Sequence, residues 1–358
     1  MVRELTHLQT ISCKDSRSSG IHVMMKKMLP TKVGSALLCL MMSTTGLVWS
    51  QVTTGTPAAV GGYPNKPIKF IVAFAPGGPA DIIARLMGQK LGETMGQPVV
   101  IENKAGAGGN IASVFVSKAQ PDGYTVLVNT SSMAVNASLL KNPGLDAEHD
   151  LVVSGIVASS PNLLVSSPSV KAKNLQEWVQ EAKGGKYNFG SAGAGTTPHL
   201  SAEYLFKVLA KIDVTHIPFQ GATPALQASM ASQVEMASVA LPAAVEIVKS
   251  GRVKGMAVTS VKRNASLPDV PTLAEAGYPG FVDYTWVGLF FPAKTPPDIV
   301  KRMNQEMSAL LKSQDFLNKL SAVGFEPVGG NPQEAADYLH TELAKWSKVI
   351  KEIGMKAE

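Results

Sequence analysis

The chain has 358 residues, long enough for two domains, and 17% of them are charged. Its formal net charge is +6, but residues 1–50 contain six Lys or Arg against two Asp or Glu, so residues 51–358 carry only +2. No basic run is interleaved with aromatic residues. This composition argues against a nucleic-acid partner.

The N-terminal segment has the pattern of a secretory signal peptide. Lys26 and Lys27 precede an uncharged apolar run, 33–48, which ends close to Ser50. A basic flank, a short apolar core and a small residue at the exit are typical of an export signal. This run of 16 residues is short for a membrane span, which needs about 20. We expect residues 1–50 to be removed by cleavage near Ser50, and an uncleaved anchor is the alternative.

Residues 1–50 are expected to combine this signal peptide with an N-terminal extension. A signal peptide of ordinary length would begin between Met24 and Met28. The small polar stretch 51–62 is expected to be a disordered N-terminus of the mature chain. The only cysteines, Cys13 and Cys39, precede it, so the mature chain would contain no disulfide.

Strand and helix patterns alternate along the rest of the chain. Apolar residues at helical spacing predict a helix over 81–95, and short apolar runs predict strands on both sides of it. Such alternation indicates βαβ units and a mainly parallel sheet, in which ligands bind beyond the carboxyl ends of the strands. The expected strands are 68–72, 99–101, 124–128, 187–189, 214–217, 236–239, 255–258 and 285–290. Further helices are expected at 199–210, 223–232 and 243–250, from 295–298 onward, and at the end of the chain.

The first strand-to-helix loop, 75–81, has features of a binding loop. Gly77 and Gly78 allow backbone N–H groups to approach a ligand, and Pro79 suits the first helical turn. The N–H groups at a helix N-terminus form an anion site. Asp81 has two interpretations. It caps its own helix, or it faces an amino or hydroxyl group of the ligand.

Four more segments follow strands in the same way. They are the Gly-rich loops 103–110 and 190–199, and the shorter segments 130–132 and 219–223. Hydroxyl groups beside free backbone amides suit carboxylate oxygens, although each loop taken alone also fits an ordinary tight turn with a capping Thr. The candidate ligand-binding residues are Phe74, Gly77, Gly78, Asp81, Ala107, Gly108, Ser131, Ser132, Ser191, Gly193, Thr196, Thr197, His199, Gln220 and Gly221.

Signatures of catalysis, metal binding and nucleotide binding are missing from the sequence. A dinucleotide fingerprint beginning at Gly106 would need glycine at position 111, which is Ile111. Neither His-Glu-x-x-His nor Gly-x-Ser-x-Gly occurs, and the histidines lack the spacing of metal ligands. His199 alone lies in a candidate loop, where it is expected to form hydrogen bonds at the helix start. We therefore expect no enzyme, cofactor or metal.

Several motifs occur in order along the chain. They are Pro-Gly-Gly-Pro-Ala-Asp (76–81), Glu-Asn-Lys-Ala-Gly-Ala-Gly-Gly (102–109), Pro-Asp-Gly-Tyr (121–124), Gly-Ser-Ala-Gly (190–193) and Leu-Pro-Asp-Val-Pro-Thr-Leu (267–273). Together they resemble the Bug family, the extracytoplasmic solute receptors of tripartite tricarboxylate transporters. The similarity extends from about Tyr63 to the C-terminus, and the chain differs from the family pattern at 231–235 and at 104–105.

The resemblance implies an α/β, type II periplasmic-binding-protein fold with two lobes and a cleft. The expected lobes are 63–163 with 283–358, and 164–282. Two crossover strands, near 163–165 and 283–287, would act as the hinge. The implied protein is a periplasmic monomer that delivers its ligand to membrane permease subunits. The implied ligands are di- or tricarboxylates, acidic amino acids or aromatic acids. An adaptor that presents its ligand to a membrane sensor kinase is the alternative function.

Overall fold

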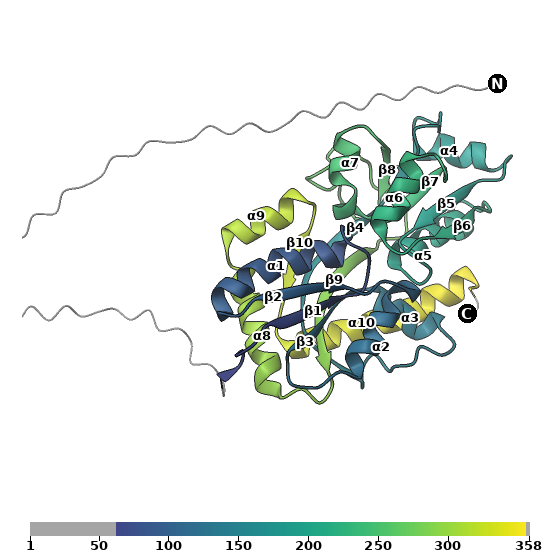
Figure 1. Ribbon diagram of the computed structural model, residues 1–358. Helices are drawn as coiled ribbons and strands as arrows, with labels where there is room; N and C mark the ends of the chain where they lie inside the picture. Colours follow the sequence, from purple (N-terminus) through teal and green to yellow (C-terminus); the bar gives the residue numbers. More distant parts are fainter. Residues whose placement is uncertain (1–61, 356–358) are drawn as a thin grey trace, which may run out of the picture. The chain divides into compact units, whose positions relative to one another are not determined.

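The computed structural model describes residues 62–355 (Figure 1). The predicted signal peptide, its cleavage site, nearly all of the predicted disordered stretch and both cysteines lie outside this range. Among the helices within it, none is both long and apolar enough to cross a membrane.

Two groups of strands share one long strand, β4 (Leu151–Ser166). The strand order is β2-β1-β3-β9-β4-β7-β5-β6, with β8 and β10 also paired to β4. The first lobe contains β1 (Ile68–Val72), α1 (Pro79–Met95), β2 (Val99–Asn103), the 3-10 helix η2 (Ala107–Gly109), α2 (Asn110–Ser117), β3 (Thr125–Thr130), α3 (Ser132–Leu139), β9 (Tyr284–Pro292), α8 (Pro297–Leu310), α9 (Gln314–Ala322), β10 (Glu326–Gly329) and α10 (Pro332–Ile353).

The second lobe is built between β4 and β9 along the chain. Its elements are α4 (Leu175–Ala182), β5 (Asn188–Ser191), α5 (Thr197–Glu203), the π-helix η3 (Tyr204–Leu209), β6 (Thr215–Pro218), α6 (Ala222–Met230), β7 (Met236–Ala240), the 3-10 helix η4 (Leu241–Ala243), α7 (Val245–Lys249) and β8 (Lys254–Val258). Figure 1 shows these teal and green elements together at the upper right, next to the purple, blue and yellow elements of the first lobe.

The strands that cross between the lobes pair differently from the others. β1 pairs in parallel with β2 and β3, and β5 pairs in parallel with β6 and β7. The pairs that β4 and β9 form are antiparallel. The prediction of mainly parallel sheets therefore describes the βαβ units inside each lobe, while the crossover strands add antiparallel ladders. Two crossover strands were expected, and β4 and β9 fill that role.

Side chains alternate across β4 as it enters the second lobe, and this alternation divides the hydrophobic core there. Leu164 packs into a cluster with Trp178 and Phe206 on one face of the sheet. Its neighbours Leu163 and Val165 pack into a cluster on the other face, as the two-residue period of a strand requires. The first lobe has its own larger core, which includes Trp286 and Trp346.

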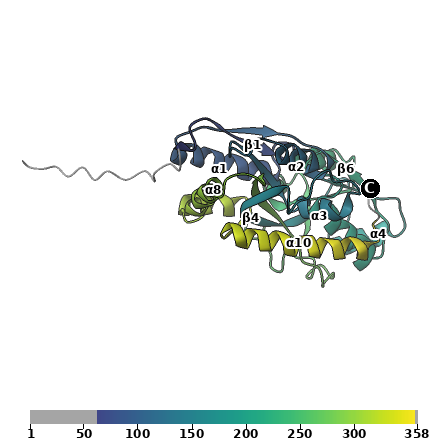
Figure 2. The same ribbon diagram turned by 90° about the horizontal axis from the view of Figure 1, so that it is seen from below.

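Helix α10 closes one side of the first lobe and also reaches the second. It begins with a capping box formed by Asn331 and Glu334 and ends at Gly354 in the left-handed conformation. It packs against α3 and β4, and also against η3 of the second lobe (Figure 2). The predicted lobe boundaries, 63–163 with 283–358 and 164–282, remain our proposal for the units that move.

Candidate ligand-binding site

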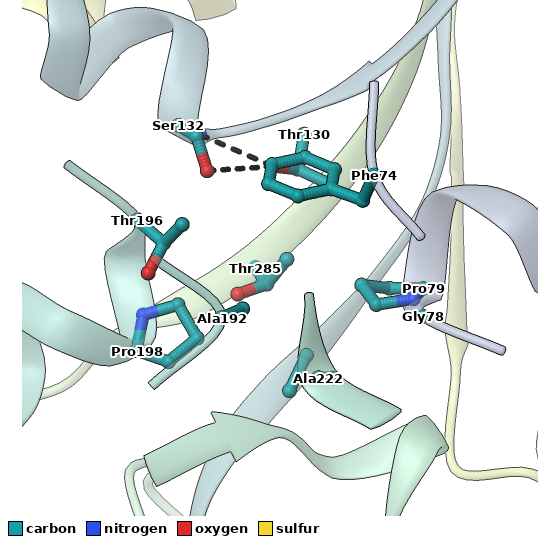
Figure 3. A pocket seen from close by; sticks show the side chains of 11 residues that line it. Phe74, Gly78, Pro79, Thr130, Ser132, Ala192, Thr196, Pro198, Ala222 and Thr285 are labelled. Carbon is teal, nitrogen blue, oxygen red and sulfur yellow. Dashed lines mark hydrogen bonds between the residues drawn. The ribbon is translucent and has the colours of Figure 1, made fainter. Parts of the chain in front are cut away.

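Four helix N-termini meet at one cavity between the lobes. α1 and α3 come from the first lobe, and α5 and α6 from the second. Each helix follows a parallel strand of its own lobe, so its first turn lies at the carboxyl end of that strand. Figure 3 shows side chains from both lobes around the central space. The lining residues are Phe74, Gly78, Pro79, Thr130, Ser132, Ala192, Thr196, Pro198, Ala222, Ala240 and Thr285.

This inner cavity contains no charged side chain among its lining residues. Its polar side chains are the hydroxyls of Thr130, Ser132, Thr196 and Thr285. The first N–H groups of an α-helix have no partner within the helix, and the helix dipole makes that end positive. Four such ends around one cavity therefore favour an anion without help from Lys or Arg.

The inner cavity is small. The centre of a water molecule has only about 20 Å³ in which to move, which is room for one or two waters. All of the lining residues except Ala192 are buried. An organic acid can therefore enter only if the lobes separate or the lining side chains move, which is the motion expected of a hinge between two lobes.

A carboxylate network fixes the loop between β1 and α1. Asp81 is 2% exposed and accepts hydrogen bonds from Arg85 (2.9 Å), from the Gly77 N–H (2.9 Å) and from the Asn103 amide (2.9 Å). Burial opposes its charge, but the bonds from Arg85, Gly77 and Asn103 outweigh burial and lower the pKa of Asp81. Both of its oxygens have protein partners. Asp81 holds the loop in place, and its side chain does not line the cavity.

Neutral side chains fix the corresponding loop between β5 and α5. The Ser191 hydroxyl lies 2.7 Å from Nε2 of His216, whose ring stacks on that of His199 at 3.7 Å between centroids. The Gly195 N–H donates to Nδ1 of His199 at 3.3 Å. Thr196 caps α5, because its hydroxyl oxygen accepts from the His199 N–H.

Burial keeps both of these histidines neutral. It lowers the pKa of His216 to about 4, and nearby Lys207 acts in the same direction. It also lowers the pKa of His199 well below its usual value, and His216 and Lys207 add to this effect. Nε2 of His199 lies 3.8 Å from the carboxylate of Glu203, which itself pairs with Lys207 at 2.6 Å. These side chains support the loop, and none of them lines the inner cavity.

A chain of hydroxyl groups crosses from one lobe to the other beside the cavity. Ser131 at the start of α3 lies 2.9 Å from the hydroxyl of Thr197 in α5. Thr197 in turn lies 2.7 Å from Thr285 on β9, and Thr285 donates to the side-chain Oδ1 of Asn162 on β4 at 2.7 Å. The two helix N-termini and both crossover strands are thus joined by hydrogen bonds. Of these four residues, only Thr285 lines the cavity.

The chain of hydrogen bonds continues to a buried charge beneath the crossover strands. The Asn162 amide and the Ser201 hydroxyl donate to Asp283, at 2.8 Å each, and Lys345 of α10 pairs with Asp283 at 2.9 Å. Burial raises the pKa of Asp283, and Lys345 partly offsets this effect. Burial works against the charge of Lys345, but Asp283 and Glu342 outweigh it and raise the pKa of Lys345. Helix α10 is thereby anchored to the start of β9.

A second space lies nearer the surface, and we call it the outer chamber. Its volume for the centre of a water molecule is about 290 Å³. It has three exposed lining residues, Ala107, Pro218 and Gln220. The other lining residues are Phe74, Gly106, Gly108, Gly109, Leu139, Leu140, Ala192, Gly193, Ala194 and Phe219.

The structure brings the predicted residues together at this cleft in three different positions. Phe74, Gly78, Ser132 and Thr196 line the inner cavity, and Phe74, Ala107, Gly108, Gly193 and Gln220 line the outer chamber. Asp81, Ser131, Ser191, Thr197 and His199 form the supporting hydrogen bonds described above. The remaining two lie at contacts between the lobes, where Gly77 approaches the side chain of Thr223 and Gly221 approaches Ala75.

Several cavity residues were not among the predicted ones. Pro79, Pro198 and Ala222 occupy first helical turns, and the helix starts would have indicated them. Thr130 ends the strand β3 next to two predicted residues. Ala192 lies within the predicted loop 190–199, between the predicted residues Ser191 and Gly193. Ala240 and Thr285 had no comparable signal, because small residues within a strand are common. Among residues 62–355, no group of His, Cys, Asp and Glu could hold a metal ion.

Two α/β lobes joined by crossover strands, with a cavity between them, define the class of two-lobed solute-binding proteins. Residues 83–355 match the model of the tripartite tricarboxylate transporter family receptor. The protein BugT of Bordetella pertussis is 32% identical over 320 residues, which cover 88% of this chain and 98% of BugT. The chain therefore belongs to this receptor family, as the resemblance to the Bug family predicted.

Solved structures of similar proteins have the same fold. The periplasmic binding protein BugD has a TM-score of 0.80 and 31% identity, and the match covers 83% of this chain and all of BugD. Rpa4515 of R. palustris, solved with adipate, has a TM-score of 0.80 and 33% identity over 82% of this chain and 99% of its own. These similarities confirm the predicted periplasmic-binding-protein fold and the class of solute-binding receptor.

Proposed function

We propose that this protein captures a small carboxylate in the inner cavity and delivers it to the membrane subunits of a tripartite tricarboxylate-type transporter. One observation carries the proposal: four helix N-termini and four hydroxyls surround a cavity that has no charged side chain in its lining. A carboxylate matches this arrangement because its oxygens accept hydrogen bonds from N–H and O–H groups. Rpa4515, solved with adipate, supports a dicarboxylate.

The rest of the proposal concerns the protein in the cell. The exported chain, cleaved near Ser50, works in the periplasm as a monomer and releases its ligand unchanged, without catalysis. The ligand-binding residues are those that line the inner cavity and the outer chamber, and the other predicted residues support them. Delivery to a permease rests on membership of the receptor family. No feature of the site favours presentation to a sensor kinase over transport.

A thermal-shift screen of di- and tricarboxylates, acidic amino acids and aromatic acids tests the proposal. A ligand present at 100 times its Kd should add about 2.7 kcal/mol to the free energy of unfolding. Neutral amides of the same acids are the matched controls and should give no shift. If no carboxylate raises the melting temperature, or if a bound acid is steadily consumed, the proposal is wrong.

A further inference from the structure

The inner cavity and the outer chamber share only two lining residues, Phe74 and Ala192. Phe74 follows β1 in the first lobe, and Ala192 follows β5 in the second. Each lobe therefore contributes one residue to the boundary between the two spaces. Phe74 is 5% exposed, whereas Ala192 is half-buried. The residues common to both spaces are thus one large aromatic side chain and one small side chain.

The position of Phe74 is fixed from two sides. Its carbonyl oxygen accepts a hydrogen bond from the Asn103 amide at 2.9 Å, which ties it to β2. The edge of the ring lies against Gly109, where an added Cβ would come within 3.0 Å of Cζ. Gly109 has a φ of +91°, in the region that favours glycine. The ring thus fills a place that the neighbouring loop leaves free, and like Thr130 it lines the inner cavity (Figure 3).

The two spaces differ in the chemistry that they offer. The inner cavity has the helix N-termini and hydroxyls, which suit a carboxylate. The outer chamber is lined by Gly, Ala, Leu, Pro and Phe with Gln220, and none of these residues is charged. Such a lining suits the uncharged carbon chain or aromatic ring of an acid, because burying apolar surface is favourable.

We propose that Phe74 and Ala192 form a partition between the two spaces, and that the size of residue 74 sets the length of acid that the protein prefers. The proposal rests on the function proposed above. The carboxylate head lies in the inner cavity. Once the lobes or the lining side chains have moved to admit the acid, a short acid stays on the inner side of the partition. The uncharged part of a longer acid must pass Phe74 to reach the outer chamber. Phe74 and Ala192 are thus residues that determine specificity.

Calorimetric titration with butanoate and hexanoate tests this proposal, because each has a single carboxylate and hexanoate is longer by two methylene groups. The measured quantity is the Kd of butanoate divided by the Kd of hexanoate. In Phe74→Ala this ratio should rise about 15-fold, since each of the two buried methylenes contributes about fourfold in affinity. Phe74→Leu should raise it less. Ala192→Val, which narrows the passage from the other lobe, should lower it.

Phe115→Ala is the matched control, because Phe115 is 46% exposed on α2 and lines neither space. Its ratio should equal that of the wild type. If Phe74→Ala does not fold, Phe74→Leu and Ala192→Val still carry the test. A ratio within twofold of the wild-type value in the folded variants, with both acids still bound, would overturn the partition. Failure of the wild-type protein to bind any carboxylate would instead overturn the proposed function.

Discussion

The loops before α1 and before α5 have the same role, but charged side chains hold the first loop and neutral side chains hold the second. Each follows a parallel strand and directs a helix N-terminus at the inner cavity. The loop before α1 is held by the charged pair Asp81 and Arg85. The loop before α5 is held by Ser191 and the stacked, neutral rings of His199 and His216. The anion site therefore does not depend on one kind of support, and its two halves should respond differently to mutation and to pH.

The largest expected effect comes from removing the charged support. Asp81→Ala deletes an almost fully buried acceptor and leaves the Gly77 N–H and the Asn103 amide without it. The free energy of unfolding should fall by about 3 kcal/mol, as measured by urea denaturation, because the hydrogen bonds that Gly77, Arg85 and Asn103 donate to this carboxylate are lost. Carboxylate binding should weaken with it, since the loop is no longer fixed.

Asp315→Ala is the matched control for this variant. Asp315 pairs with Lys319 on the exposed surface of α9. Exposed ion pairs contribute little to stability, so its loss should be much smaller. Equal losses in the two variants would show that Asp81 gives the loop no special support.

The second effect is a loss of stability in mild acid that originates in the loop before α5. Unfolded histidine has a pKa of about 6.5, and burial lowers the pKa of folded His216 to about 4. Between these values the unfolded chain binds a proton that the folded chain does not, so stability falls as the pH falls. From pH 7 to pH 5, His216 alone should account for about 2 kcal/mol.

Denaturation at several pH values separates the two supports. His216→Asn should remove the contribution of this histidine to the acid loss. His149→Asn should leave that contribution in place, because the pKa of the exposed His149 is raised by Asp146. The pKa of Asp81 is lowered, so its contribution is lost only below the usual Asp range, about 3.9. A curve that stays flat from pH 7 to pH 5 in the wild type would contradict the neutral-histidine support.

The smallest effect concerns the hydroxyl chain that joins the two loops. Thr197→Val keeps the shape of the side chain but removes its bonds to Ser131 and Thr285. The loss should be about 1 kcal/mol, seen as a Kd for adipate several-fold weaker, because both of these bonds link the lobes. Thr341→Val on the exposed face of α10 is the control and should leave the Kd unchanged. An unchanged Kd in Thr197→Val would show that closure does not use this chain.

The sequence indicated the loops better than it indicated what holds them. The helix predicted at 81–95 begins two residues earlier, at Pro79. Proline is favoured in the first helical turn, and Gly78 before it has an extended conformation. For Asp81 the sequence left two interpretations open, and the structure adds three specific partners. Arg85 lies one helical turn away, but Asn103 lies 22 residues away along the chain. A local sequence pattern cannot reveal a contact between residues as far apart in sequence as Asp81 and Asn103.

The loop before α5 shows the same limit more strongly. His199 was expected to form hydrogen bonds at the helix start, and its N–H does bond to the capping Thr196. Its stacking partner His216 was predicted only as part of a strand. The two rings meet because β5 and β6 pair in parallel, with Phe189 opposite His216. The helix expected over 199–210 also changes to a π-helix at Tyr204, which the apolar spacing did not indicate.

The fold was predictable where each lobe repeats a βαβ unit and less so elsewhere. The short helices α3 and α4 and the helix α9 were not predicted. β4 was expected only near 163–165, although it extends over 16 residues. Its pairs with β9 and β7 lie far apart in sequence, and β-bulges interrupt its ladder with β9. When two strands that pair are far apart in sequence, the hydrophobic pattern of either strand does not identify its partner.

Calorimetric titration of the purified wild-type protein with adipate and with its neutral diamide tests the central claim most directly. The two molecules have the same carbon chain and differ in whether their ends are negatively charged. If helix N-termini hold a carboxylate, adipate binds and the diamide binds at least 100-fold more weakly, because charge-assisted hydrogen bonds at the cavity are lost. Equal affinity for the two, or binding of the diamide alone, would contradict the account.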